Sequence, residues 1–432
     1  MGIFDLFGGK KASEDAEAQK EQSLAQKREK EMQAAMDAHA EMKWPDFPRL
    51  NPVNVNGTEN VDMITTVSDE RKNEIGEMIY DSEMPAESLK FLSNQELLFL
   101  LTALEVFHKA APLPGFEQNH RKIYNELLGR VRDAQTLFVL YDATTGYPFI
   151  DHGFANVYFE KEIAEKAVEL FSKQFRRLAA REVKVENPDD TAAVKRGFFD
   201  YLYYIGIENI MVDNGAYRSR FKRNEIVAAP GDWNNQDDGK NPVNPSLNFA
   251  MLDFLEELKW PVKYEKRDEV VRAKEMRMLS LIRSGSFIVP MQHEGPVEVL
   301  EDGKMKFSKE TKFKFLVMNT KDEKQFIPAF TDAIEFGKKL RGTEWNAAVF
   351  KYQDILKFVN DKAGIIINPD GQRVILPKER MFMLEVAGQQ ADRMKGAAKT
   401  AASSVNDSEE AVVQKALNQA MARMNENKES EQ

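Results

Sequence analysis

The chain has 432 residues, of which 42% are hydrophobic and 30% are charged, and its formal net charge is −10. At roughly 150 residues per domain, this length predicts two or three folded units of a globular protein. The absence of cysteine excludes disulfides, thiolate metal sites and a cysteine nucleophile, and the acidic balance argues against a protein wrapped around nucleic acid or an anionic bilayer.

The first segment, residues 1–43, is predicted to be a polar and mostly solvated helix. It is rich in Ala, Glu, Lys, Gln and Met, which favour helix, and its few large apolar side chains give only a thin seam. We expect it to reach a partner or a second chain. Residues 1–11 lack the long apolar run of a signal peptide, and peripheral membrane contact through them stays an open alternative. The apolar side chains concerned are Ile3, Phe4, Leu6 and Phe7.

Residues 61–228 are predicted to hold a helical hairpin followed by a small sheet. Ser93 and Glu96 have the spacing of a capping box, and the apolar helix that follows runs to about His108. Its apolar run, residues 97–107, is far shorter than the roughly 20 residues of a membrane span. A second helix is predicted over about 117–132, and apolar strands and amphipathic helices alternate from Leu137 onward.

A second stretch, residues 266–388, repeats the pattern of the first sheet region. In an ungapped register Phe138 aligns with Phe315, and the later strand and turn at 210–218 align with 365–373. We therefore predict an α/β (α+β) fold with two tandem copies of a small mixed β-sheet module with flanking helices, bracketed by long N-terminal and C-terminal helices.

The remaining segments are predicted to connect or extend these modules. Residues 229–265 read as a linker, because Pro, Gly, Asn and Asp crowd its first half. Residues 389–432 read as an Ala-rich helical or disordered tail, with a break at about 403–407 and a short helix over about 409–424.

The second copy resembles the N-terminal domain of the SseB family, named for enhanced serine sensitivity. The resemblance rests on Phe326-Ile327-Pro328-Ala329-Phe330-Thr331-Asp332, on Gly364-Ile365-Ile366-Ile367-Asn368-Pro369-Asp370-Gly371 and on Leu376-Pro377. It covers about residues 270–388, and it implies an α/β fold and a bacterial cytoplasmic protein of uncharacterised role. The first copy lacks the Asn-Pro turn.

Candidate site residues are few, and none of the five histidines falls in a metal-binding motif. His152 beside Asp151 is the most interesting, because it follows a strand end, where sites of α/β folds gather; a loop histidine without a role is the simpler interpretation. His108 and His120 flank one helical hairpin. We expect no catalytic, cofactor or metal site.

Two further patterns have simple structural interpretations. Asp237 and Asp238 could ligate Ca²⁺, but a solvated linker explains them. The basic and aromatic strip Arg218–Arg223 could bind a phosphate backbone. We favour the alternative, an edge strand whose charges discourage pairing with another strand.

We expect a non-enzymatic cytoplasmic adaptor that binds protein partners, with the N-terminal helix as the candidate binding element. A homo-oligomer stays an open alternative, and we expect no nucleic acid partner. The alternative is a small-ligand sensor or enzyme that uses the cleft between the two modules, with His152 and Asp151 involved.

Overall fold

The computed structural model describes residues 5–46, 65–186, 197–229, 242–299, 305–307 and 310–401. It confirms the mixed α/β class, with helices packed on small mixed and antiparallel sheets. The short helix expected over 409–424 lies outside the described residues. Within these ranges, no helix is both long enough and apolar enough to cross a bilayer.

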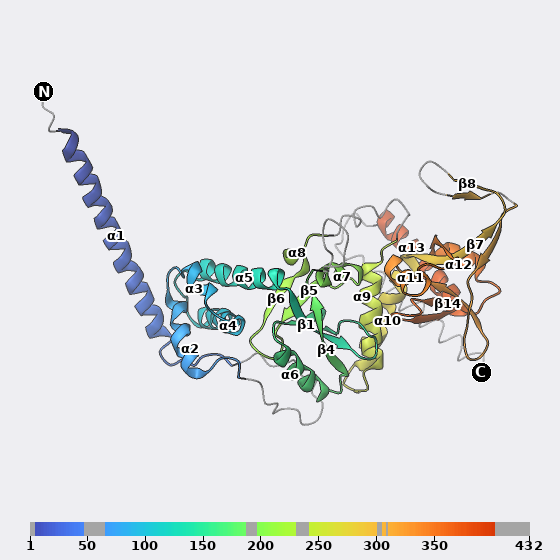
Figure 1. Ribbon diagram of the computed structural model, residues 1–432, viewed down its shortest axis with the longest axis horizontal. Coiled ribbons are helices and arrows are strands. Elements are labelled where there is room, and N and C mark those ends of the chain that lie inside the picture. Colours follow the sequence, from blue (N-terminus) through green and yellow to red (C-terminus); the bar gives the residue numbers. More distant parts are fainter. Residues whose placement is uncertain are drawn as a thin grey trace.

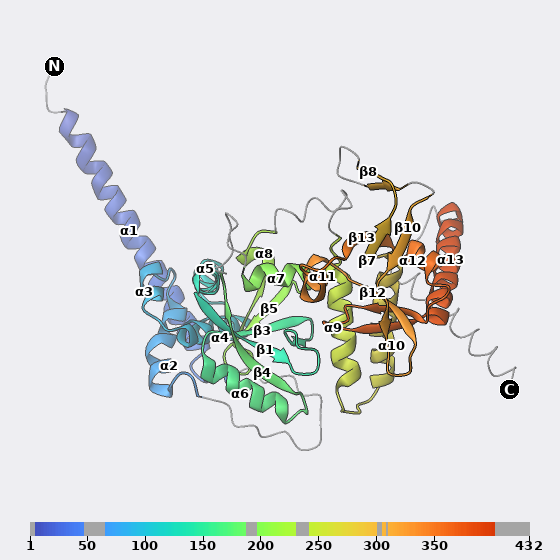
Figure 2. The same cartoon turned by 45° about the vertical axis from the view of Figure 1, so that its right-hand side comes forward.

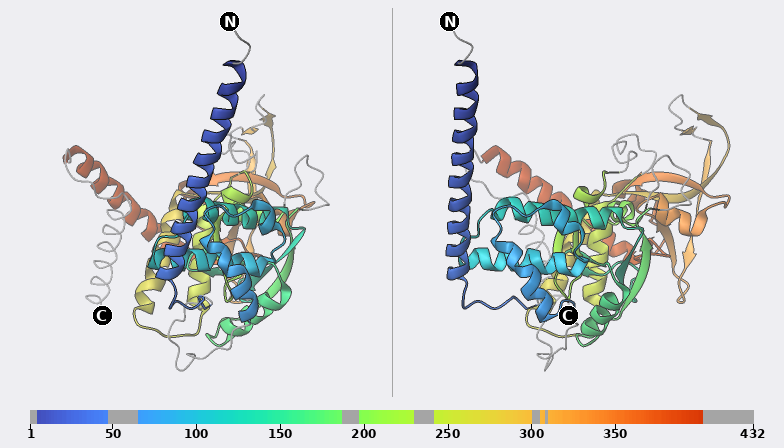
Figure 3. Two further views of the ribbon diagram at one scale, coloured as in Figure 1. Left: turned by 90° about the vertical axis from the view of Figure 1, so that its left-hand side faces the viewer. Right: turned by 60° about the vertical axis from the view of Figure 1, so that its left-hand side comes forward.

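The N-terminal helix α1 (Asp5–Ala38) stands clear of the body over most of its length (Figures 1 and 3). Residues 22–30 are all exposed. Only its last turns are anchored: Ala35 is buried, and the ring of His39 lies 3.0 Å from the carbonyl oxygen of Phe107 through Nε2. The helix is therefore held at one end only.

The first module joins a helical part to a mixed sheet. Its helices before the sheet are α2 (Asp69–Gly76), the 3-10 helix η1 (Glu77–Tyr80), α3 (Ala86–Lys90), α4 (Asn94–Ala110) and α5 (Phe116–Asp133). Its later elements are β1 (Thr136–Asp142), β2 (Ile150–Asp151), β3 (Phe154–Tyr158), α6 (Lys161–Ser172), β4 (Leu178–Lys184), α7 (Phe198–Tyr204), β5 (Asn209–Val212), β6 (Ser219–Lys222) and α8 (Arg223–Ile226). The capping box at Ser93 and Glu96 is confirmed.

The sheet of the first module has the strand order β4-β1-β3-β5-β6, with β2 paired to β3. Only β3 and β5 run parallel. Alternate side chains such as Val139 and Val157 join the core that includes α4 and α5, while Leu140 and Tyr158 face the other way into the core with α6. Successive side chains of these strands point to opposite faces of the sheet, so each strand contributes to both cores.

The second module begins with the antiparallel helices α9 (Pro245–Lys259) and α10 (Arg267–Ser284), which stand between the two sheets (Figure 2). Its later elements are β7 (Ser286–Glu294), β8 (Val297–Val299), β9 (Met305–Phe307), β10 (Lys312–Phe315), β11 (Met318–Asn319), β12 (Gln325–Ala329), α11 (Ala333–Leu340), β13 (Asn346–Lys351), α12 (Tyr352–Phe358), β14 (Gly364–Ile367), β15 (Val374–Pro377) and α13 (Lys378–Ala401). The strands form the orders β10-β7-β13 and β11-β12-β14-β15, and a bridge between Ile288 and Phe330 connects the two.

Two expected boundaries need correction. The stretch expected as a linker, 229–265, contains α9, whose Met251 and Phe254 are buried in the core of the second module. The Asn and Pro residues just before Pro245 are typical of a loop, so the sequence does not indicate that a helix starts there. The boundary at residue 388 falls inside α13, and Ala391 beyond it is buried.

The register expected for the first half of the repeat is wrong. Phe138 lies in the central strand β1 opposite Tyr158, whereas Phe315 lies in β10, which pairs only with the far end of β7. The strand in the position of β1 is β7, where Ile288 pairs with Phe330. The additional strands β8 to β10 follow β7 and shift the sequence spacing. Strands β5 and β14 do hold matching positions, and the internal duplication itself stays a prediction.

The parallel strand pair ends in the same turn in both modules. Asp213 after β5 and Asn368 after β14 have left-handed backbones, with φ of 54° and 46°. The Asp213 amide donates to the carbonyl of Val157 at 2.8 Å, and its Oδ1 accepts from the Phe159 amide at 3.1 Å. In the second module Asn368 makes the same two bonds, to Ala329 at 2.9 Å and from Thr331 at 3.0 Å.

Both side chains are fully buried, but Asp213 is ionisable and Asn368 is not. Burial raises its pKa to about 8, against the lowering effect of the Phe159 amide. The side chain of Gln95 from α4 also bonds Oδ2 at 2.5 Å. The carboxyl group is therefore protonated at neutral pH in the folded chain.

We predict that Asp213→Asn stabilises the protein increasingly as pH rises. The folded pKa of about 8 lies above the ordinary 3.8, so the folded state holds the proton more firmly than the unfolded state. The wild type then loses free energy of unfolding as pH rises from about 4 to about 8, and a neutral amide does not. Urea unfolding should therefore show a gain that is larger at pH 8 than at pH 5, because each pH unit between the two pKa values costs the wild type about 1.4 kcal/mol. A gain that is equal at both pH values contradicts the assignment.

Candidate functional site

The histidines of the helical hairpin have structural surroundings. His39 is buried, and His108 accepts a hydrogen bond from the Leu113 amide at 3.1 Å and stacks on the ring of Phe116 at 3.7 Å. His120 pairs with Glu105 at 2.9 Å. His108 and His120 thus both contact Phe116, and no cluster of metal-ligating side chains occurs in the described residues. Asp237 and Asp238 lie outside them.

The expected basic strip Arg218–Arg223 divides into separate roles. Arg223 is buried, donates to the carbonyls of Leu202 and Ile207, and lies 3.5 Å over the ring of Tyr203. Arg220 is exposed and lies over the ring of Phe154. Arg218 instead turns toward a group of polar side chains. The strip is not one surface.

That group, the Asp151 cluster, gathers residues from the β2–β3 turn, from β3 and from the β5–β6 turn. Its members are Asp151, His152, Asn156, Asn214 and Arg218. Asn214 is the hub: Nδ2 donates to Asp151 Oδ2 at 3.2 Å and to Asn156 Oδ1 at 2.8 Å, and Oδ1 accepts from Arg218 Nη1 at 2.7 Å. Asn156 and Asn214 are buried, with exposures of 0% and 1%.

The second module has no counterpart to this cluster. Asn156 pairs with Met211 across the parallel strands, and the residue in the matching register of the second module is Pro328, opposite Ile366. The position after the left-handed residue, Asn214 in the first module, is occupied by Pro369 in the second. Two buried amides therefore stand where the second module has prolines, which cannot make these side-chain hydrogen bonds.

His152 forms the exposed end of the cluster. Its Nδ1 lies 2.8 Å from Asp151 Oδ1, and its side chain is 60% exposed, against 18% for Asp151. A carboxylate only accepts, so Nδ1 carries the proton and Nε2 is the nitrogen that titrates. The hydrogen bond to Asp151 raises the pKa of His152, against the lowering effects of burial and of nearby Lys274 and Arg176. The pair is therefore an oriented histidine whose protonated form is favoured by the neighbouring carboxylate.

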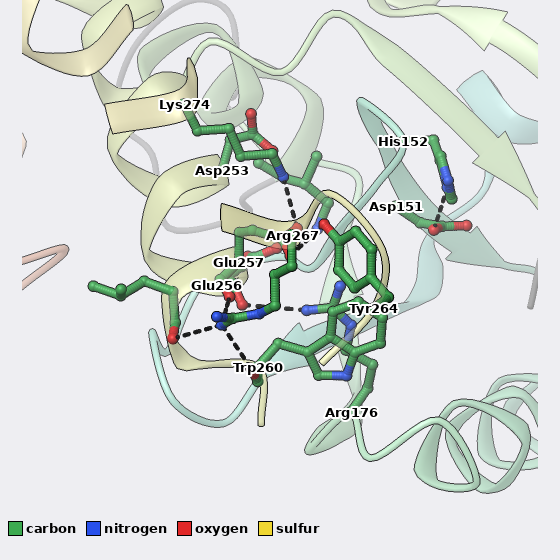
Figure 4. A network of polar contacts seen from close by, with 12 residues as sticks. Asp151, His152, Arg176, Asp253, Glu256, Glu257, Trp260, Tyr264, Arg267 and Lys274 are labelled. Carbon is green, nitrogen blue, oxygen red and sulfur yellow. Dashed lines mark hydrogen bonds and ion pairs between the residues drawn. The ribbon is translucent and has the colours of Figure 1, made fainter. Parts of the chain in front are cut away.

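A second polar network fastens this corner to the helices of the second module (Figure 4). Glu256 of α9 is 4% exposed and accepts the amide of Ile150 at 3.0 Å. Burial and the nearby Asp142 raise its pKa well above the ordinary range. Arg176 lies 3.7 Å over the ring of Trp260 and donates to the Glu256 carbonyl at 3.2 Å. These contacts fix the strand that carries Asp151.

The charged side chains at the α9–α10 turn pair among themselves. Lys274 bridges Asp253 at 2.9 Å and Glu257 at 3.0 Å, and Tyr264 donates to Glu257 at 2.9 Å. Arg267 donates to the carbonyls of Glu257 and Trp260, both at 2.9 Å, and so satisfies the end of α9. This network holds the backbone in place. His152 lies apart from it (Figure 4), and its side chain is mostly exposed.

Sequence reasoning found Asp151, His152 and Arg218 but not what joins them. Asn156 and Asn214 lie 58 residues apart and meet only through the parallel pairing of β3 and β5. Aligning the two modules with Asn156 over Pro328 shows a buried amide in one module where the other has proline. The incorrect register expected for the first hairpin does not bring these two residues together.

These features define a protein with two mixed α/β modules, one of which carries a polar surface cluster. Residues 265–381 match the family model of the SseB protein N-terminal domain, so this part of the second module is similar to that domain. The match covers α10 through the start of α13. No curated protein and no solved structure matched the chain.

We predict that Asp151→Asn lowers the pKa of His152 toward its ordinary value, because the hydrogen bond to the carboxylate is the main cause of the raised pKa. The titration of the ring protons by NMR measures this directly. Glu105→Gln is the matched control, since it removes the carboxylate partner of His120 and leaves that of His152. An unchanged His152 titration in Asp151→Asn would contradict the pairing.

Proposed function

We propose that this chain is a non-enzymatic interaction protein, an adaptor, whose α1 helix engages a protein partner. The observation that carries the proposal is the projection of α1: residues 22–30 are exposed on every side, and anchoring is confined to the end near Ala35 and His39. A helix of 34 residues spans roughly 50 Å. It extends the reach of the body and joins the core only through its last turns, at Ala35.

The use of the buried ionisable groups supports the same proposal. Asp213 fixes a strand end, Glu256 holds the Ile150 amide, and Asp332 caps α11 by accepting the Glu335 amide at 2.9 Å. Each carboxyl group accepts a backbone amide, and Asp213 and Asp332 also accept hydrogen bonds from buried side chains, as in a scaffold that keeps surfaces in a fixed arrangement.

The adaptor proposal predicts that partner capture from the native cytoplasm depends on α1. A chain lacking residues 1–30 keeps Ala35 and His39 and should fold normally, while the partners recovered with the full chain and identified by mass spectrometry should be lost. Removal of residues 1–43 should have the same effect on capture with a lower stability, because the contact of His39 with Phe107 goes too. Recovery of the same partners without residues 1–30 would refute the role of α1.

The second candidate function is a small-ligand sensor or enzyme, and the Asp151–His152 pair favours it. An imidazole held by a carboxylate with its other nitrogen free to titrate is the arrangement of a general base. The pair also sits where the first module departs from the second.

We predict that His152→Ala abolishes ligand response or turnover if this second function holds, and leaves the phenotype of the gene unchanged if the adaptor proposal holds. The matched control is His120→Ala, which removes a histidine that is also paired to a carboxylate but lies on the helical hairpin. Complementation of a deletion strain with each variant, at equal protein level, separates the two functions.

A further inference from the structure

A shallow groove, the α5 groove, follows the exposed side of α5 and continues to the end of β6. Three adjoining hollows of about 460, 600 and 540 Å³ form it. The first two share Phe116 in their lining, and the last two share Tyr124. Helix α5 lies beside α8 at this end (Figure 1). The groove therefore runs along the helix for roughly 13 Å, from Phe116 to Asn125, before it reaches the sheet.

The floor of the α5 groove is a row of aromatic rings in mutual contact. The ring of His120 lies 5.6 Å from that of Phe116 and 6.3 Å from that of Tyr124, and Tyr124 packs on the buried Phe221 at 4.9 Å. Phe154 of β3 extends the row on the far side of β6. Apart from Phe221, these rings are only partly buried. The floor is thus apolar and still reachable from solvent.

Three exposed cations line the α5 groove, and no carboxylate pairs with them in the part of the chain that the structure describes. They are Arg121 of α5 and, at the β6 end, Arg220 and Lys222. By contrast, Lys122 on the same helix pairs with Glu83 at 3.2 Å. The whole chain has a net charge of −10, so unpaired positive side chains gathered in one groove favour a negatively charged ligand there.

The carboxylates of the α5 groove are placed differently. Glu225 accepts the hydroxyl of Tyr124 at 3.0 Å and the backbone amide of Lys222 at 2.7 Å, so its oxygens are engaged by the protein itself. Glu117 lies toward the other end, in the two hollows that Phe116 lines. The end near Tyr124 therefore presents free cations beside an aromatic floor.

We propose that the α5 groove binds an extended acidic segment of a partner protein. Carboxylates of the segment pair with Arg121, Arg220 and Lys222, and an aromatic side chain between them packs on the floor near Tyr124. An extended chain rises about 3.3 Å per residue, so the part along α5 holds about four residues. This surface is separate from α1, and the inference does not depend on the role proposed for that helix.

The lining favours a peptide over a single-stranded nucleic acid. Glu117 and Glu225 both line the groove and would repel an evenly charged phosphate backbone. The rings also lean on one another, with angles of 45° between Phe116 and His120 and between Tyr124 and Phe221. They do not stand free, as the platforms on which bases stack do.

The test measures binding of a fluorescein-labelled octapeptide that alternates glutamate and phenylalanine, by fluorescence anisotropy with the full chain at low salt. The variant Arg121→Gln, Arg220→Gln, Lys222→Gln should bind it about tenfold more weakly, because three exposed ion pairs are lost. The matched control is Lys184→Gln, Arg341→Gln, Lys351→Gln. It removes the same charge from exposed positions outside the groove and should bind like the wild type. All six side chains are exposed, so both variants should keep the wild-type thermal midpoint.

Two further probes separate the occupants. The same octapeptide with alanine in place of phenylalanine should bind several-fold more weakly, because it cannot use the aromatic floor. An oligothymidylate of equal length should bind more weakly than the glutamate peptide. Absence of peptide binding, equal loss in the two variants or equal binding of the alanine peptide overturns the proposal. Tighter binding of the oligothymidylate assigns the groove to nucleic acid, and a wild-type dimer that the groove variant dissociates in light scattering assigns it to a second copy. Either result also overturns the proposal.

Discussion

The geometry of each module depends on one side chain at the end of the parallel strand pair. Asp213 and Asn368 hold left-handed backbones and accept the amide of the residue that leads into the next helix. This bond ties the end of one parallel strand to the chain leaving the other, so the crossover helix starts at a fixed angle. In the second module the network continues, because Asn368 Nδ2 donates to the Thr331 hydroxyl, which bonds the capping residue Asp332. The motif that carries the family resemblance is thus a structural device.

Local signals in the sequence were enough to predict the helices of the hairpin and the turn after the last parallel strand. The capping box of Ser93 and Glu96 predicts the start of α4. The pair Asn368-Pro369 predicts the turn after β14. The local sequence does not show that β7 holds the position of β1. Strands β8 to β11 separate β7 from β12 along the chain, although β7 and β12 are neighbours in space. α9 was concealed for a related reason: Pro245 begins the helix, but it follows a polar run that is typical of a linker.

Only part of the candidate site could be predicted from the sequence, because most of its residues meet through the fold. Asp151 and His152 are neighbours in sequence, so their pairing could be expected. Asn156 is a polar residue in the otherwise apolar strand β3, and Asn214 lies in the turn after β5. Their side chains come within 2.8 Å only because β3 and β5 pair in a parallel register. Glu256 is harder still, because nothing in the pattern of α9 indicates that a carboxyl on this helix reaches the Ile150 amide of the other module.

The two modules use one framework for different ends. In the second module, polar groups near the strand-end turn face the rest of the chain: Gln372 donates to Asn248 of α9 at 2.9 Å, and Glu335 accepts the hydroxyl of Tyr147 from the first module at 2.8 Å. All four side chains are buried. The Tyr147–Glu335 bond and the bond that Asn248 donates to the Tyr204 carbonyl hold the two modules together. At the equivalent turn of the first module, the Asp151 cluster instead extends from the buried Asn156 and Asn214 to the exposed His152. A framework that is already rigid can carry such a group at little structural cost, which makes the first module the place where a role specific to this chain would be located.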